Sequence, residues 1–161
     1  MQLAEHIGYQ PKWIITKFAN DDAVSKNTPF DVSEIDGNLL LNEGITRLMN
    51  LLIGGGGTAF NNANARIGVG DDATVEDAAQ TGLLAVTNND YVGMAATYPQ
   101  IAGQTITFRA VFDGNTGNFD WNEMTVDNGA AAGENLNRKV SAQGTKVLGQ
   151  TWTVDLQITF S

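Results

Sequence analysis

The chain has 161 residues, the size of one ordinary domain, and 42% of them are hydrophobic, enough to bury a core. Eighteen acidic residues against nine Lys and Arg give a net charge of -9, so nucleic acids and anionic membranes are poor partners. The absence of cysteine excludes disulfides, thiolate metal sites and cysteine nucleophiles.

Residues 1–40 lack a regular apolar period. Pro11 and Pro29 interrupt the segment and its apolar residues are scattered, which favours an extended N-terminal arm with one or two short strands, such as 13–18. His6, the single histidine, lies in this arm, and we interpret it as a surface or interface residue because one histidine cannot form a triad or a histidine metal centre. The start of the chain lacks the pattern of a secretion signal, so we expect synthesis in a host cytoplasm.

One segment, near 42–53, has a helical apolar period. The residues that recur at this spacing are Leu41, Ile45, Leu48, Met49 and Leu52. Asn42 is a candidate N-cap, and the four glycines at 54–57 should end the helix because ordering them costs too much backbone entropy. The glycines follow a helix and precede no lysine, so they do not form a phosphate loop. We expect the helix to lie against one open end or face of a sandwich.

After the helix, short alternating segments are separated by Gly, Asn and Asp turns, which is typical of an all-β sandwich or barrel. The segment 104–112 alternates well, and the turn 113–118 joins it to 119–126, so these two strands are predicted to form a hairpin. Weaker strand candidates are 65–69, 83–87, 92–98 and 136–141.

The clearest strand is the last, 150–160. Apolar residues occupy every second position from Trp152 to Phe160, so Trp152 should face the core and Thr153 the solvent. The chain is therefore predicted to be one antiparallel β-sandwich, jelly-roll or immunoglobulin-like, over residues 41–161, with the arm 1–40 in front of it. We expect the sandwich to fold without that arm.

Two acidic segments could be considered as cation sites. One is a cluster that could offer several oxygens to calcium but that we interpret as a solvated loop, and its members are Asp71, Asp72, Glu76 and Asp77. The other, 113–117, starts like a calcium loop, but Asn118 stands where glycine is expected and Met124 where glutamate is expected. The sequence therefore predicts no metal site and no cofactor.

Glu123 beside Trp121 is the strongest candidate for chemistry, because glycosidases use carboxylates and aromatic rings stack on sugars. Alternation, however, places Phe119, Trp121 and Glu123 on one strand face. A core or interface face with one paired glutamate is the favoured interpretation. The sequence thus predicts no catalytic residue and a structural protein that is not an enzyme.

Several short sequence motifs between Leu41 and Phe160 resemble those of virion proteins of tailed bacteriophages. They are Asn42-Glu-Gly-Ile-Thr-Arg-Leu, Gly54-Gly-Gly-Gly-Thr-Ala-Phe, Ala65-Arg-Ile-Gly-Val-Gly, Phe119-Asp-Trp-Asn-Glu, Leu136-Asn-Arg-Lys and Thr151-Trp-Thr-Val. Capsid decoration, or cement, proteins are the most similar group. The resemblance implies a small β-sandwich that coats the particle as a trimer at lattice three-fold points, and it carries over no functional residues.

From this resemblance we expect a homotrimer on the capsid exterior of a virion, bound to the major capsid protein through residues 1–40 and one end of the sandwich. Nucleic acid and membrane are not expected partners. Two other classes stay open: a tail or fibre component that could bind host-surface glycans, and a hydrolase or lectin with an unrecognised site. The compact chain has no repeats, which argues against a fibre.

Overall fold

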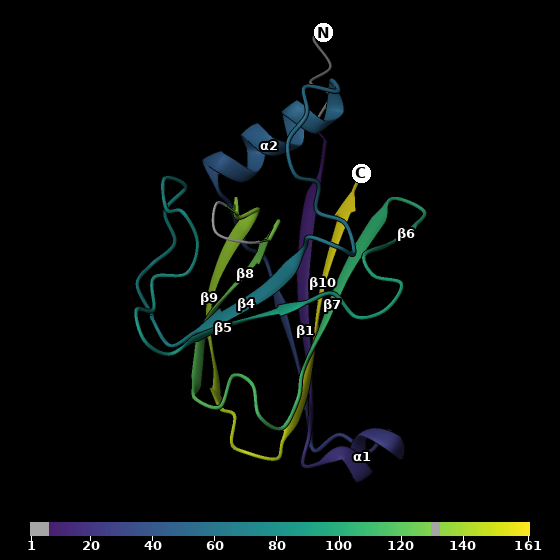
Figure 1. Cartoon of the computed structure of the whole chain (residues 1–161), viewed down its shortest axis with the longest axis vertical. Coiled ribbons are helices and arrows are strands. Elements are labelled where there is room, and N and C mark those ends of the chain that lie inside the picture. Colours follow the sequence, from purple (N-terminus) through teal and green to yellow (C-terminus); the bar gives the residue numbers. More distant parts are fainter. Residues whose placement is uncertain (1–6, 130–132) are drawn as a thin grey trace, which may run out of the picture.

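The strands form two antiparallel sheets of five strands each, in a computed structural model that describes residues 7–129 and 133–161 (Figure 1). In spatial order, the first sheet contains β2 (Asp31–Asp36), β1 (Tyr9–Phe18), β10 (Thr151–Phe160), β7 (Thr105–Phe112) and β6 (Gln100–Ala102). The second contains β3 (Leu39–Leu40), β9 (Asn137–Thr145), β8 (Asp120–Asp127), β4 (Arg66–Gly70) and β5 (Asn89–Gly93). The predicted all-β sandwich is confirmed.

In the described part of the chain, two helices accompany the sheets, where the sequence predicted one. The short α1 (Asp21–Ser25) follows β1, and the Asn20 side chain caps it by accepting a hydrogen bond from the Ala23 N–H at 2.9 Å. The longer α2 (Asn42–Leu52) confirms the predicted helix, and it lies beyond one end of the sandwich, opposite α1 (Figure 1). Asn42 is not its N-cap: that position belongs to Leu41, which makes no side-chain capping bond.

Residues 9–36 are part of the sandwich, so the predicted arm over 1–40 is wrong for this stretch. β1 pairs with β10 from Tyr9 opposite Phe160 to Phe18 opposite Thr151, and its other edge pairs with β2. Pro11 is compatible with this position because it lies where the pairing with β2 ends, and its carbonyl accepts from Gly37 N–H. Removing residues 1–40 would delete a strand that is paired on both edges, which favours the opposite expectation, that the sandwich does not fold without them.

The predicted hairpin between 104–112 and 119–126 does not form. β7 pairs with β10 and β6, whereas β8 pairs with β9 and β4, so the connection 113–118 crosses from one sheet to the other. The crossing lets both strands face the core from opposite sides: the Phe112 and Trp121 rings meet edge to face with centroids 4.8 Å apart. Trp121 also donates from Nε1 to the carbonyl of Gly117 at 2.8 Å.

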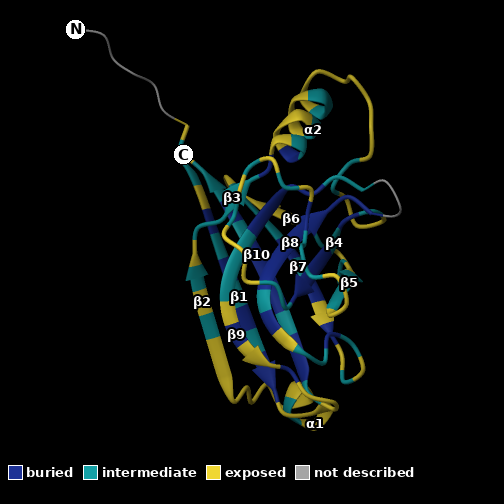
Figure 2. Cartoon of the chain, turned by 90° about the vertical axis from the view of Figure 1, so that its left-hand side faces the viewer, coloured by how far each residue is buried: buried dark blue, intermediate teal, exposed yellow. Residues whose placement is uncertain are grey.

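The buried residues gather on the strands of the two sheets (Figure 2), and the core that they form contains all three tryptophans. Trp152 is 2% exposed and Thr153 is half-buried, so the predicted facing of β10 is confirmed. Two weak strand predictions fail: 83–87 is irregular, and 92–98 shares only its first two residues with β5. The main inward-facing residues are Trp13, Ile15, Phe108, Phe112, Val154 and Leu156 from the first sheet and Ile67, Trp121, Met124 and Val126 from the second.

Candidate binding surface

Glu123 does not share a face with Trp121, because a β-bulge between them shifts the register of β8 against β9. Trp121 therefore faces the core, while Glu123 joins the outer face of the second sheet. Glu123 is nevertheless fully buried, and so is its ion-pair partner Arg138, whose Nε donates to Glu123 Oε2 at 2.7 Å. The expectation of a paired glutamate holds, but the predicted alternation is wrong at the bulge.

The segment 71–88, the loop beside the second sheet in Figure 1, covers this buried pair. The backbone N–H groups of Leu84 and Ala85 donate to the Glu123 carboxylate at 3.0 Å and 2.8 Å. Arg138 Nη1 donates to the carbonyl of Thr74 at 2.7 Å. Both charged groups are saturated by protein partners, so this face offers a general acid or base no access to a substrate.

Glycine at position 70 makes this close approach possible. A Cβ atom on Gly70 would lie 2.6 Å from Oε1 of Glu123 and 2.9 Å from the Cβ of Ala85. Nearby, the Tyr91 ring packs over Gly68, where a Cβ would meet it at 2.5 Å, and burial raises the pKa of Tyr91 to about 12. The Gly68-Val69-Gly70 pattern in the sequence is therefore the local signal of a covered outer face.

The acidic residues of 71–77 hold this segment in place and do not converge. Asp71 accepts from Asn88 Nδ2 at 2.6 Å, Glu76 from Val140 N–H at 2.6 Å, and Asp77 from Ala79 N–H at 2.8 Å. The hydrogen bond from the Thr74 N–H lowers the pKa of Asp72. In the part of the chain that the structure describes, no three His, Cys, Asp or Glu side chains are grouped to hold a metal ion.

Asp113 belongs to a turn that its own carboxylate stabilises. Oδ1 accepts from the Asn115 N–H at 2.9 Å and from the Thr116 hydroxyl at 3.2 Å. The Asn115 N–H bond is the largest cause of the lowered pKa of Asp113. The segment is therefore a turn, but it connects the two sheets and is not the hairpin turn that the sequence predicted. The remaining candidate, His6, lies outside the described residues.

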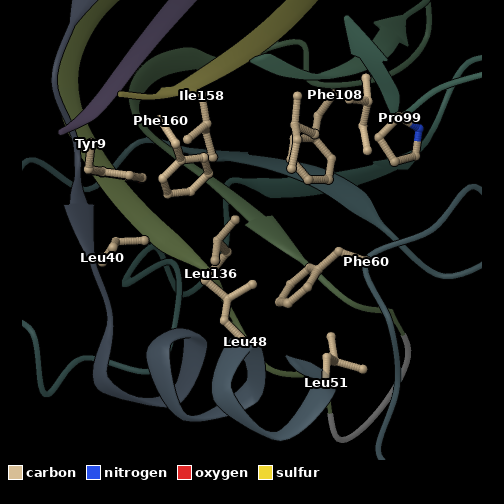
Figure 3. A pocket seen from close by; sticks show the side chains of 12 residues that line it. Tyr9, Leu40, Leu48, Leu51, Phe60, Pro99, Phe108, Leu136, Ile158 and Phe160 are labelled. Carbon is tan, nitrogen blue, oxygen red and sulfur yellow. The ribbon is translucent and has the colours of Figure 1, made fainter. Parts of the chain in front are cut away.

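An apolar pocket of about 280 Å³ lies at the α2 end of the sandwich, between the helix and the strand ends (Figure 3). Among the described residues that line it, none is charged, and the one polar side-chain group is the Tyr9 hydroxyl, which donates to Asn38 Oδ1 at 2.7 Å. Burial raises the pKa of Tyr9 to about 12, so the phenol stays neutral. The lining residues are Tyr9, Leu40, Leu48, Leu51, Phe60, Pro99, Ile101, Ile106, Phe108, Leu136, Ile158 and Phe160.

Polar contacts anchor the first half of α2. Arg47 forms a two-point ion pair with Glu134, in which Nη2 donates to Oε1 at 2.8 Å. Glu43 Oε1 accepts from the Asn135 N–H at 2.5 Å. Gly44 lies against the backbone of Leu136, whose oxygen would be 2.4 Å from an added Cβ. The helix is thus fixed at its start, independently of its apolar side chains.

The second half of α2 exposes apolar side chains. Leu52 is 85% exposed, Ile53 just beyond the helix is 79% exposed, and Met49 is 56% exposed. Figure 2 shows α2 projecting from the end of the sandwich with exposed and half-buried residues along it. The apolar period predicted the helix correctly, but among residues 7–129 and 133–161 no other element covers Met49, Leu52 and Ile53. Together with the pocket, these residues form what we call the α2-end surface.

Comparisons of the chain with protein-family models, with curated proteins and with solved structures find no match. Within the described residues, no helix is long and apolar enough to cross a membrane. The α2-end surface presents exposed apolar side chains beside an apolar pocket. Exposed apolar patches of this kind mark surfaces that bind partners.

Proposed function

We propose that the protein is a capsid decoration protein of a tailed phage, which binds the exterior of the capsid lattice and does no catalysis. The observation that carries the proposal is the α2-end surface, where Leu52 and Ile53 project into solvent beside an uncharged pocket. Burying such side chains against a partner is favourable at about 25 cal/mol per Å² of apolar area. The short sequence motifs from Leu41 to Phe160 that resemble tailed-phage virion proteins support the phage assignment.

The proposed partner is the major capsid protein, and the proposed assembly is a homotrimer. Since residues 9–36 form strands of the sandwich, the α2 end replaces the arm as the principal contact surface in this proposal. Repeated contacts on a symmetric lattice add their strengths, so each one need not be tight. Sedimentation equilibrium should give a mass of about three times 17.2 kDa, and a monomer mass at all concentrations would contradict the trimer.

The capsid proposal is tested by mixing bare capsids with the intact protein, with the double variant Leu52→Ser/Ile53→Ser and with the control Leu148→Ser. Leu148 is also exposed, at 76%, but lies with Asp21 of α1 at the opposite end of the sandwich. We expect the intact protein and the control to coat capsids, and the double variant to bind at least about tenfold more weakly.

Two results would contradict this function. Equal binding by all three proteins would show that the α2-end surface is not the contact. Failure of the intact protein to bind capsids, combined with its presence on purified tails, would favour the tail component instead. Circular dichroism melts of the double variant should match those of the intact protein, because both substituted side chains are exposed.

A further inference from the structure

Lys146 is a fully buried lysine that follows β9 and makes no ion pair among the described residues. Its Nζ donates to the backbone oxygen of Asp113 at 2.6 Å and to Oδ1 of Asn118 at 2.9 Å. The other buried lysine, Lys17, instead contacts a carboxylate, Asp31 Oδ2, at 2.7 Å. An ammonium group buried against neutral acceptors alone is costly, which favours the neutral amine at position 146.

A neutral lysine amine is a nucleophile. Desolvation lowers the pKa of Lys146, while the charges of Asp113 and Asp90 act against that change. The amine is shielded from solvent and from external electrophiles by its complete burial. The side-chain carbonyl that it contacts is the carboxamide of Asn118.

The geometry points to an intramolecular isopeptide bond between Lys146 Nζ and Asn118 Cγ. The neutral amine attacks Cγ, the new Nζ–Cγ bond forms, and the Cγ–Nδ2 bond breaks. One proton moves from Nζ to the departing nitrogen, which leaves as ammonia. The reaction needs no oxidant, no reductant and no second substrate.

Both reacting side chains are held in place before the reaction. The Lys146 backbone N–H donates to the Phe119 oxygen at 3.1 Å, which aligns the end of β9 with the start of β8. Asn118 Nδ2 donates to the Gly114 oxygen at 3.1 Å. Fixed proximity of this kind replaces the entropy loss of a bimolecular encounter.

The carboxylate of Asp90 in β5 contacts the same connection. Asp90 Oδ2 accepts from the N–H of Gly117, the residue before Asn118, at 2.9 Å, and its charge acts on Lys146. The bond would tie the crossing connection 113–118 covalently to the end of β9. It would therefore restrict the unfolded chain and stabilise the end of the sandwich near α1. This inference is independent of the proposed function.

The test is the intact mass of the folded, full-length protein, followed by tryptic peptide mapping. We expect a mass lower than that of the sequence by one ammonia, and a joined pair of peptides that contains Asn118 and Lys146 with no cleavage after Lys146. Lys146→Arg and Asn118→Ala should both restore the full mass. The control Lys139→Arg, at a lysine whose Nζ contacts the Asp36 carbonyl in an exposed position, should keep the deficit.

Three results would contradict the proposed bond. They are a folded protein with the full mass of its sequence, separate peptides with normal cleavage after Lys146, and a mass deficit of one ammonia that persists in Lys146→Arg. The last result would indicate a succinimide formed elsewhere in the chain. Should either variant fail to fold, peptide mapping of the unsubstituted protein decides the question by itself.

Discussion

The outer faces of the two sheets are protected in different ways. On the first sheet, the outward Thr16 and Thr153 are half-buried, and Arg109, with a side chain 37% exposed, pairs with the nearly buried Asp155. On the second sheet, the outward Glu123 and Arg138 are fully buried beneath residues 71–88.

This difference shows how a polar face can be buried without apolar residues. The covering segment supplies backbone N–H and C=O groups that satisfy each charged atom it buries. The energetic consequence is an asymmetry, because removing one partner from the covered face leaves a buried charge, whereas removing one from the open face exposes its partner to water. Four predictions follow this contrast from large to small effects.

The largest effect is expected for Arg138→Ala, because the buried Glu123 carboxylate would lose its cationic partner. We expect the free energy of unfolding to fall by about 3–5 kcal/mol. Urea denaturation measures this value, and hydrogen exchange should show faster exchange at Leu84 and Ala85. A loss below about 1 kcal/mol would mean that the cover over the second sheet is not held by this pair.

Trp152→Ala should cost a similar amount, about 3–5 kcal/mol, because it removes a side chain packed edge to face against Trp121 at 4.8 Å. Thr153→Ala on the open outer face should cost less than about 1 kcal/mol. Denaturant melts of both variants compare the two faces of the same strand. Equal costs would indicate that the outer face of the first sheet is also buried, as in an oligomer.

Arg109→Ala is the matched counterpart of Arg138→Ala on the first sheet. The Arg109 side chain is 37% exposed and donates to Asp155 through two nitrogens at 2.6 Å. Asp155 is covered on its solvent side by this exposed arginine, so removing Arg109 lets water reach the carboxylate, and we expect a loss of about 1 kcal/mol or less in the same urea assay. A loss as large as that of Arg138→Ala would remove the proposed distinction between the sheets.

The smallest effect is expected from metal removal. Asp71, Asp72, Glu76 and Asp77 each accept protein hydrogen bonds, and we predict that residues 71–88 need no ion to cover the second sheet. Melting temperatures with calcium and with a chelator should therefore agree. A fall of several degrees in the chelator would assign a cation to this segment.

The local pattern of apolar and polar residues was sufficient to predict several elements. The strict alternation of 150–160 predicted β10 and the inward position of Trp152, and the 3.6-residue period predicted α2 together with its end at the glycine run. These signals suffice because side-chain direction in a strand or helix depends on the residue's own backbone geometry. The Asp113 turn is also local, since its carboxylate bonds residues two and three positions ahead.

The sequence by itself thus determined the all-β class, the strongest strands and the helix, while strand partners and covered faces were decided by tertiary structure. Tyr9–Phe18 looks irregular along the chain but gains its place by pairing with β10 from the other end of the sequence. The bulge before Glu123 and the cover from 71–88 likewise depend on distant backbone groups. Such contacts leave no period in the sequence, because hydrogen bonds between remote segments are specified by position in space and not by spacing along the chain.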